Sequence, residues 1–291
     1  MRNDKNSFLR CNIMSILDFV GNTPTVELWQ GVYAKLEMKN PSGSVKDRAA
    51  KAIVGNANLP FGSRIVEATS GNFGISLALI SAVMGYSLTV VMPEGASVER
   101  EKIITHYGGR VVRVKGNMSV ARDLAGEIAM EEKAFMPDQF SNPYNVLAHY
   151  STTAPEILRD LDHVDIFVSG VGSGGSITGV ARYLKERNPD TYVVAVHPSQ
   201  GSMIEGIGAG FMPPIFDSSL ANEDIFVGFN EAVCYSRLLA REYGIMAGIS
   251  SGAAAFAAKI LAGRPENRGK RIVTLLPDGG DRYFSTPLFA L

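Results

Sequence analysis

One lysine stands where a helix is predicted to begin, in the run NPSGSVKDR (residues 40–48). Ser44 is a good N-cap residue, and Asp47, three positions later, can reach back to it as in a capping box. Lys46 then lies in the first helical turn, where the partial positive charge of the helix dipole disfavours an ammonium group. An ordinary surface lysine would turn away into solvent. The alternative is a lysine whose amine is neutral or covalently bound during part of a reaction.

Two glycine-rich turns follow predicted strands and are suited to binding anions. The turn EATSGNFG (67–74) offers successive backbone N–H groups, the hydroxyls of Thr69 and Ser70 and the amide of Asn72. Its simpler interpretation is a tight β–α turn with a Ser/Thr cap. The turn SGVGSGGSITG (169–179) has four glycines in seven positions, which lets the backbone approach a ligand closely. A phosphate at the following helix N-terminus is the ligand that this turn favours.

The second turn also resembles a dinucleotide-binding pattern, because Gly170, Gly172 and Gly175 fit G-x-G-x-x-G. That pattern expects an acidic residue about 20 positions later, at the end of the next strand, to bind a ribose. Here the strand TYVVAV is followed by His197 and Pro198. The sequence also lacks the P-loop pattern G-x-x-x-x-G-K-[ST]. The turn therefore suits a monophosphate without a ribose.

A third turn, GISSGAAAFAA (248–258), opens an alanine-rich helix with two serines, and by itself it indicates a plain Ser N-cap. The lysine, the phosphate turn and the second anion site together favour a phosphate-bearing carbonyl cofactor bound as a Schiff base. Pyridoxal 5′-phosphate (PLP) has both groups, a phosphate and an aldehyde that reacts with an amine.

Strands alternating with helices must position these turns. The helical stretches include 74–84 and 97–107. The alternation predicts an α/β fold with parallel sheets covered by helices on both faces, and ligands at the carboxyl ends of the strands. The stretch 198–224 is irregular and rich in Gly, Pro and Ser, so we expect it to line or close a site. The runs rich in Val and Ile that predict strands are 32–38, 64–68, 87–92, 110–114, 165–170, 191–197 and 271–276.

Composition excludes several classes of partner and cofactor. The 291 residues carry a net charge of −1, so we expect neither nucleic-acid nor membrane binding. The four histidines and two cysteines form no metal-ligand spacing, so no metal is expected. Cys11 and Cys234 are typical of reduced thiols in a cytoplasmic protein. Residues 1–13 resemble a loose tail without a secretory h-region, and Met14 is an alternative start.

Ten short motifs occur in order between residue 17 and the C-terminus: GNTP (21–24), KLEMKNPSGSVKDRAA (35–50), EATSGNFG (67–74), VMPEGASVEREK (91–102), DQFSNP (138–143), AHYSTTAPEI (148–157), GVGSGGSITGV (170–180), GIGAGF (206–211), GISSGAA (248–254) and DRYFST (281–286). Together they resemble the motifs of the cysteine synthase family, the PLP-dependent O-acetylserine sulfhydrylases of fold type II.

The resemblance implies a two-lobed, tryptophan synthase β-like fold with parallel-rich sheets flanked by helices and PLP in the cleft between the lobes. The smaller N-terminal lobe would span residues 40–147, with a mobile part at about 86–130. The larger C-terminal lobe would combine 14–39 with 148–291. The family is usually homodimeric, and the C-terminal tail of a serine acetyltransferase is a candidate partner.

The same resemblance assigns roles to individual residues. Lys46 corresponds to the catalytic lysine that binds PLP covalently, Asn72 to the residue that binds its ring hydroxyl, and Ser250 to the serine that faces its pyridine nitrogen. The residues that correspond to the phosphate-binding loop are Gly172, Ser173, Gly174, Gly175 and Ser176. The residues that correspond to the site for the substrate's α-carboxylate are Thr69, Ser70, Gly71, Asn72 and Gln139.

The implied reaction is a β-replacement that converts O-acetyl-L-serine and sulfide to L-cysteine and acetate through an α-aminoacrylate, with Lys46 as the general base. Related alternatives use thiosulfate, giving S-sulfocysteine, or serine and homocysteine as in cystathionine β-synthases. The chain stops soon after DRYFSTPLFAL, so we do not expect the regulatory domain common in the latter enzymes. A non-catalytic nucleotide-binding protein is the alternative from a different class.

Two positions bear on the substrate. Phe73 stands where the family more often has threonine, and its ring either reshapes the carboxylate site or packs beneath the loop. The segment 201–212 contains no arginine, which argues against O-phosphoserine as the substrate.

Overall fold

The computed structural model describes residues 14–208 and 210–290, and it contains two β-sheets. A six-stranded sheet has the order β1-β2-β9-β6-β7-β8, and a three-stranded sheet has the order β3-β4-β5. The strands are β1 (Thr25–Trp29), β2 (Val32–Leu36), β3 (Arg64–Ala68), β4 (Ser87–Pro93), β5 (Arg110–Val114), β6 (Ile166–Gly170), β7 (Tyr192–Pro198), β8 (Glu223–Val227) and β9 (Ile272–Leu276).

Helices alternate with the strands, as the sequence predicted. The α-helices are α1 (Lys46–Asn56), α2 (Asn72–Met84), α3 (Val98–His106), α4 (Met118–Glu132), α5 (Pro143–Ala148), α6 (Ala154–Leu161), α7 (Gly175–Arg187), α8 (Phe229–Tyr243) and α9 (Ile249–Ala262). A π-helix, η4 (His149–Thr153), joins α5 to α6. The 3-10 helices are η2 (Ile16–Phe19), η3 (Glu37–Lys39), η5 (Ser218–Leu220), η6 (Pro265–Asn267) and η7 (Gly280–Tyr283).

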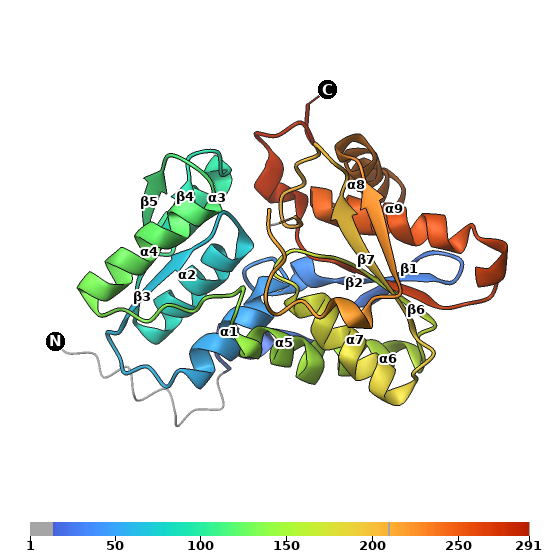
Figure 1. Cartoon of the computed structure of the whole chain (residues 1–291), viewed down its shortest axis with the longest axis horizontal. Helices are drawn as coiled ribbons and strands as arrows, with labels where there is room; N and C mark the ends of the chain where they lie inside the picture. Colours follow the sequence, from blue (N-terminus) through green and yellow to red (C-terminus); the bar gives the residue numbers. More distant parts are fainter. Residues whose placement is uncertain (1–13, 209, 291) are drawn as a thin grey trace.

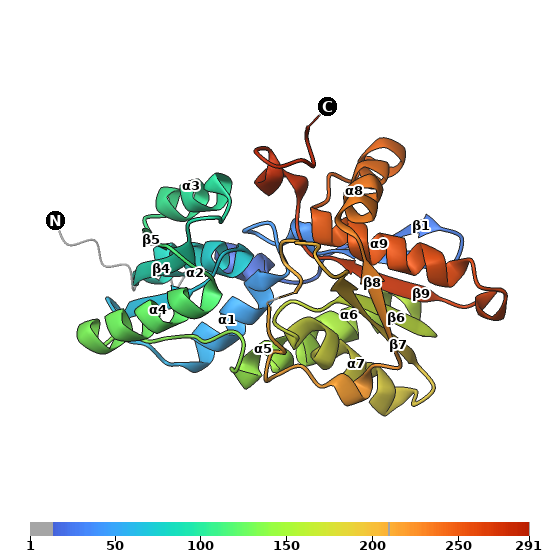
Figure 2. The ribbon, with the colours of Figure 1, turned by 45° about the horizontal axis from the view of Figure 1, so that its top comes forward.

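The two sheets define two lobes that lie side by side in Figure 1. We call the three-stranded sheet with α2, α3 and α4 the small lobe, and the six-stranded sheet with α6 to α9 the large lobe. Helices α1 and α5 lie between them (Figures 1 and 2). The α/β class with helix-flanked, mostly parallel sheets is therefore confirmed. The lobe boundaries at residues 40 and 147 stay a prediction.

The large sheet is covered by helices on both faces, α8 and α9 on one side and α6 and α7 on the other (Figure 2). Alternate strand residues face opposite layers: Val168 belongs to the core cluster that includes α9, and Phe167 to the cluster that includes α7. Every residue of β9 is buried. This burial explains why Val and Ile runs without polar alternation predicted these strands correctly.

A buried ion cluster attaches α1 to the large lobe. The Arg48 guanidinium pairs with Glu37 (Nε–Oε2, 2.7 Å) and with Glu156 (Nη2–Oε2, 2.7 Å). Lys35 Nζ lies 3.1 Å from the same Glu156 carboxylate. Because removing one partner would leave an uncompensated buried charge, the cluster holds α1 in one position. It thereby fixes the first residue of that helix, Lys46.

All seven predicted strands are present, and two further strands were missed. β1 pairs antiparallel with β2 at the edge of the large sheet and is followed by a turn of only two residues. β8 pairs parallel with β7 and begins inside the stretch predicted to be irregular. Its first residue, Glu223, forms an ion pair with Arg264 at 2.6 Å. Because β8 begins with acidic residues, the sequence did not indicate a strand here. Helix α2 begins at Asn72, two residues earlier than predicted.

None of the helices in the described part of the chain is both long enough and apolar enough to cross a membrane. The predicted loose tail at residues 1–13, which includes Cys11, lies outside the described residues.

The α8–α9 contact gives a test of the core. A Cβ added at Gly252 in α9 would lie 2.0 Å from the backbone oxygen of Ala232, so we expect Gly252→Ala to lower the free energy of unfolding by about 1–3 kcal/mol. Gly126 in α4 is the matched control, because no described atom lies within 4 Å of its Cβ position. There alanine should raise the free energy of unfolding by about 0.5–1 kcal/mol. Urea unfolding of both variants measures the difference, and equal effects would contradict the packing.

Candidate active site

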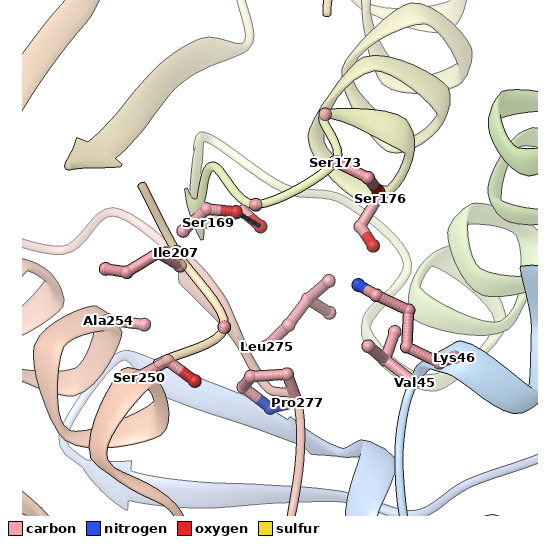
Figure 3. A pocket seen from close by; sticks show the side chains of 14 residues that line it. Val45, Lys46, Ser169, Ser173, Ser176, Ile207, Ser250, Ala254, Leu275 and Pro277 are labelled. Atoms are coloured by element: carbon pink, nitrogen blue, oxygen red, sulfur yellow. Dashed lines mark hydrogen bonds between the residues drawn. The ribbon is translucent and has the colours of Figure 1, made fainter. Parts of the chain in front are cut away.

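A pocket lies where the first turn of α1 meets the carboxyl ends of β6 and β9, the position expected for a ligand in a parallel sheet. Figure 3 shows the Lys46 amine entering it from one wall and the Ser250 side chain lying at another. The lining residues are Val45, Lys46, Ser169, Gly170, Gly172, Ser173, Gly174, Ser176, Gly206, Ile207, Ser250, Ala254, Leu275 and Pro277.

Lys46 is the first residue of α1, and its amine points toward the Ser176 hydroxyl (Figure 3). Burial lowers the pKa of Lys46, and the Asp278 carboxylate opposes this by raising it. The helix N-terminus adds to the effect of burial, since its partial positive charge also disfavours an ammonium. The site therefore favours an amine that loses its proton more readily than an exposed lysine does.

The predicted N-cap at Ser44 and its capping box with Asp47 are wrong, because Val45 is the N-cap residue of α1. Ser44 Oγ does accept the backbone N–H of Lys46 at 3.3 Å. Asp47 does not reach back to Ser44. Its buried carboxylate instead accepts the backbone N–H of Ser42 at 2.6 Å and the hydroxyl of Ser76 at 2.6 Å. Asp47 thus ties the loop before α1 to α2, a contact that sequence spacing did not reveal.

The predicted phosphate loop, residues 172–176, lines the pocket and leads into α7. Its glycines are required by close contacts: a Cβ at Gly172 would lie 2.3 Å from the Gly206 oxygen. Gly174 has φ +86°, and a Cβ there would lie 2.5 Å from Phe216 Cβ. The hydroxyls of Ser173 and Ser176 stand beside the first backbone N–H groups of a 13-residue helix, an arrangement suited to a phosphate.

Two buried residues behind this loop were missed by the sequence analysis. Asn145 Nδ2 donates to Ser173 Oγ at 3.0 Å and to the Gln139 oxygen at 2.8 Å, so one amide supports both predicted anion sites. A Cβ at Gly175 would lie 2.1 Å from Asn145 Oδ1. His149, in the π-helix, bonds Ser176 Oγ through Nε2 at 3.1 Å and Thr153 Oγ1 through Nδ1 at 2.9 Å. π-helical turns are frequent at functional sites.

The turn predicted to bind a carboxylate leads into α2, with Gly71 at the N-cap. Thr69 Oγ1 accepts the Gly71 N–H at 3.2 Å, and Ser70 is exposed. Gln139 is buried nearby, its N–H 3.4 Å from a Glu67 carboxylate oxygen. Burial raises the pKa of Glu67 to about 8. Glu67, at the end of β3, therefore ties Gln139 to the strand that carries the turn.

Asn72 connects this turn to the lysine side of the site. Its Nδ2 donates to Asp278 Oδ2 at 2.7 Å, and the Tyr283 hydroxyl donates to the same oxygen at 2.7 Å. Asn72 Oδ1 and Asp278 Oδ1 are buried and find no hydrogen-bond partner among the described residues. Polar atoms buried in this way are costly unless a ligand or solvent satisfies them. Asp278 was not predicted, because its role depends on contacts distant in sequence.

The positions of Ser250 and Phe73 decide between the alternatives that the sequence left open for each residue. Ser250 lies in the first turn of α9, buried and facing the pocket, and Gly248 rather than a serine is the N-cap residue. The plain Ser N-cap interpretation is therefore wrong. Phe73 is 1% exposed and belongs to the core cluster of the small lobe, so its ring packs beneath the loop.

The chemistry of these residues fits PLP. The pocket brings together the glycine loop at the N-terminus of α7, whose backbone N–H groups suit a phosphate, and an amine with a lowered pKa, which suits an aldehyde. Within residues 14–208 and 210–290, no cluster of three or more His, Cys, Asp or Glu side chains is arranged to hold a metal ion. Cys234 is an exposed free thiol and is not among the residues that line the pocket.

Comparison with known proteins identifies the family of this chain. The family model for pyridoxal-phosphate dependent enzymes matches residues 16–278. A cysteine synthase of Staphylococcus aureus is 40% identical over an alignment of 301 positions, covering 95% of this chain and 97% of that protein. The chain therefore belongs to the pyridoxal-phosphate-dependent enzymes and, among them, to the cysteine synthase family.

Solved structures show the same architecture. O-ureido-L-serine synthase matches with a TM-score of 0.92 and 40% identity, covering 95% of each chain. Cysteine synthase from Entamoeba histolytica matches with a TM-score of 0.90 and 38% identity, covering 97% of this chain and 92% of that one. A hydrogen sulfide-producing enzyme from Fusobacterium nucleatum matches with a TM-score of 0.88 and 38% identity, covering 92% of this chain and 99% of that one.

The buried His149 makes stability depend on pH. Burial and the nearby Arg48 guanidinium lower the pKa of His149 from 6.5 to about 3. Between these values the unfolded chain binds a proton that the folded protein does not, so acidification destabilises the fold. Relative to His149→Gln, the wild type should lose about 2 kcal/mol of unfolding free energy between pH 7 and pH 5.

The measurement is urea unfolding of the PLP-saturated proteins at several pH values, followed by the fluorescence of the single tryptophan, Trp29. A constant difference between the wild type and His149→Gln across this pH range would show that His149 binds its proton equally well in the folded and unfolded protein, which would contradict the lowered pKa.

Proposed function

We propose that the chain catalyses β-replacement on O-acetyl-L-serine with sulfide, releasing L-cysteine and acetate. The observation that carries this proposal is the Lys46 amine, desolvated and aimed into a pocket whose other walls are the glycine loop and Ser250. Membership in the cysteine synthase family supports a β-replacement, since that family's relatives include cysteine synthases from two organisms.

Each group of residues has a role in this reaction. The backbone N–H groups at the start of α7, with Ser173 and Ser176, would hold the cofactor's phosphate. The turn 69–72 and Gln139 hold the substrate's α-carboxylate. PLP, when bound, supplies an aldehyde for an amine and a ring that accepts the electron pair left at Cα. Asn72 would bind its ring hydroxyl, and Ser250 would face its pyridine nitrogen.

Lys46 moves the proton. As a neutral amine it removes the proton from Cα of the substrate, and acetate leaves Cβ with its bonding electron pair. Sulfide then forms a bond to Cβ, and the Lys46 ammonium returns a proton to Cα. Asp278 stabilises that ammonium while it exists, because its carboxylate raises the pKa that burial lowers. The two opposing influences suit a group that must both take and give a proton.

A second candidate is a β-replacement that yields O-ureido-L-serine. The structural match to O-ureido-L-serine synthase, at a TM-score of 0.92, favours it. The two candidates share the amino-acid half of the reaction and differ in the nucleophile. Thiosulfate and homocysteine remain further candidate nucleophiles.

We also propose that the protein is a cytoplasmic homodimer whose cleft accepts the C-terminal tail of a serine acetyltransferase. The smaller lobe, 40–147, would close over the substrate through its mobile part at about 86–130, which would exclude water. These proposals follow from the family resemblance.

The substrate assignment is tested by a matrix of assays. Three amino-acid donors, O-acetyl-L-serine, L-serine and L-cysteine, are each combined with sulfide, thiosulfate, homocysteine or hydroxyurea. We expect the highest kcat/KM for O-acetyl-L-serine with sulfide, by about 10-fold or more. A higher value for another pair, or faster release of sulfide from L-cysteine, would contradict the proposed substrates while leaving PLP chemistry in place.

Lys46 is tested separately by substitution. Lys46→Ala should lower kcat by about 10³-fold or more, because the reaction loses its base. Lys51, in the same helix, is exposed and donates only to the Leu17 backbone oxygen, so Lys51→Ala is the control and should keep wild-type kcat. An active Lys46→Ala enzyme would contradict the mechanism.

A further inference from the structure

One loop of the large lobe reaches the small lobe beside the pocket. It follows β7 and comprises residues 199–208, which we call the bridging loop. Gly206 and Ile207 line the pocket, and the Gly208 N–H donates to the Val171 oxygen at 2.9 Å. The loop is thus anchored to the large lobe at one end of the pocket. Its Glu205 makes an ion pair with Arg100 of α3, in the small lobe.

Arg100 is unusually buried for an arginine, with 2% of its side chain exposed. Its Nη1 donates to Ser97 Oγ at 3.1 Å and to the carboxylate of Glu205. Its guanidinium carbon lies 4.9 Å from the ring centre of Tyr283, within the range of a cation–π contact. One guanidinium therefore joins α3 to the bridging loop and to the C-terminal segment of the large lobe.

Arg100 also lies beside the turn that we propose binds the substrate's carboxylate. A Cβ placed on Gly71 would lie 4.0 Å from Arg100 Nε. That Nε is buried and has no hydrogen-bond partner in the described part of the chain. Beyond the guanidinium, Tyr283 donates to Asp278, which accepts from Asn72. A continuous set of contacts therefore runs from Glu205 to the first residue of α2.

Glu205 is much more exposed than Arg100, and this difference decides what happens when their ion pair breaks. Glu205 has 38% of its side chain exposed, so its carboxylate is readily hydrated when the pair breaks. Arg100 would be left as an uncompensated buried charge, which is strongly unfavourable. Arg100 regains solvation only if α3 moves away from the bridging loop. Loss of the pair therefore favours separation of the lobes.

We propose that Arg100 and Glu205 are positioning residues whose ion pair holds the two lobes together and keeps the carboxylate-binding turn at its working distance from Lys46. The effect of the ion pair on KM rests on the proposed function, whereas its effect on the distance between the lobes does not. A second contact, between Glu99 and the hydroxyl and N–H of Ser285 at 2.9 and 2.7 Å, joins the same helix to the large lobe. It is exposed and involves a neutral partner, so the Arg100–Glu205 pair is the stronger connection.

The test replaces Glu205 by glutamine, which keeps the shape and removes the charge. Glu101→Gln is the matched control: Glu101 is on the same helix and pairs with Arg113 at 2.6 Å, a contact that stays inside the small lobe. In the holoenzyme, Glu205→Gln should raise KM for O-acetyl-L-serine about fivefold and change kcat less than twofold. Glu101→Gln should change neither.

A second readout does not depend on turnover. Spin labels on the native Cys234 of α8 and on a Met130→Cys substitution in α4, with Cys11→Ser, report the distance between the lobes. Met130 is 80% exposed, so its label should not disturb packing. Diluting labelled with unlabelled protein confines the measurement to one chain. Glu205→Gln should give a longer and broader distance distribution, and Glu101→Gln the wild-type distribution.

An unchanged distribution in Glu205→Gln would overturn the proposal, as would a changed distribution with an unchanged KM. If the wild type does not turn over O-acetyl-L-serine, the proposed substrate fails by itself. The inference is then decided by the distance distribution together with the affinity for L-serine, measured through the absorbance of bound PLP. Either a wild-type distribution or a wild-type affinity in Glu205→Gln would then overturn it.

Discussion

The amine of Lys46 is subject to two opposing influences on which the rest of the site depends. Burial at the start of α1 lowers its pKa, and the carboxylate of Asp278 raises it. Neither influence alone suits a group that accepts a proton and then returns it. The ion cluster around Arg48 holds α1, and with it the amine, at the carboxyl ends of the large-lobe strands. Helix α1 thus sets the position of the amine, and the amine's burial together with Asp278 sets the proton affinity.

The groups that face the ligand are held by a second set of buried residues from other parts of the chain. Asn145 supports both Gln139 and Ser173, and His149 supports Ser176. Asn145 thereby links Gln139, in the proposed carboxylate site, to Ser173, in the proposed phosphate loop. Asn145 and His149 fix the orientation of these neighbouring groups through hydrogen bonds. A site built largely from loops requires such support.

The parts of the site that could be predicted from the sequence are those with a local chemical cause. The glycine-rich turns at 67–74 and 169–179 each lead from a strand into a helix, which favours an anion site, and Lys46 was conspicuous because its helix opposes its charge. Asn145, His149 and Asp278 act through contacts that only tertiary folding brings together, so no spacing could reveal them. The strands β1 and β8 were missed for a similar reason: they are edge strands that pair on one side only and lack an uninterrupted run of Val and Ile.

Mass spectrometry of the borohydride-reduced holoenzyme shows directly whether Lys46 carries the cofactor. After digestion, we expect the peptide containing Lys46 to gain the mass of a reduced pyridoxyl phosphate group, and peptides with other lysines, including Lys35 and Lys51, to keep their unmodified mass. An unmodified Lys46 peptide from fully loaded, coloured protein, or the label on another lysine, would show that Lys46 is not the residue that binds PLP.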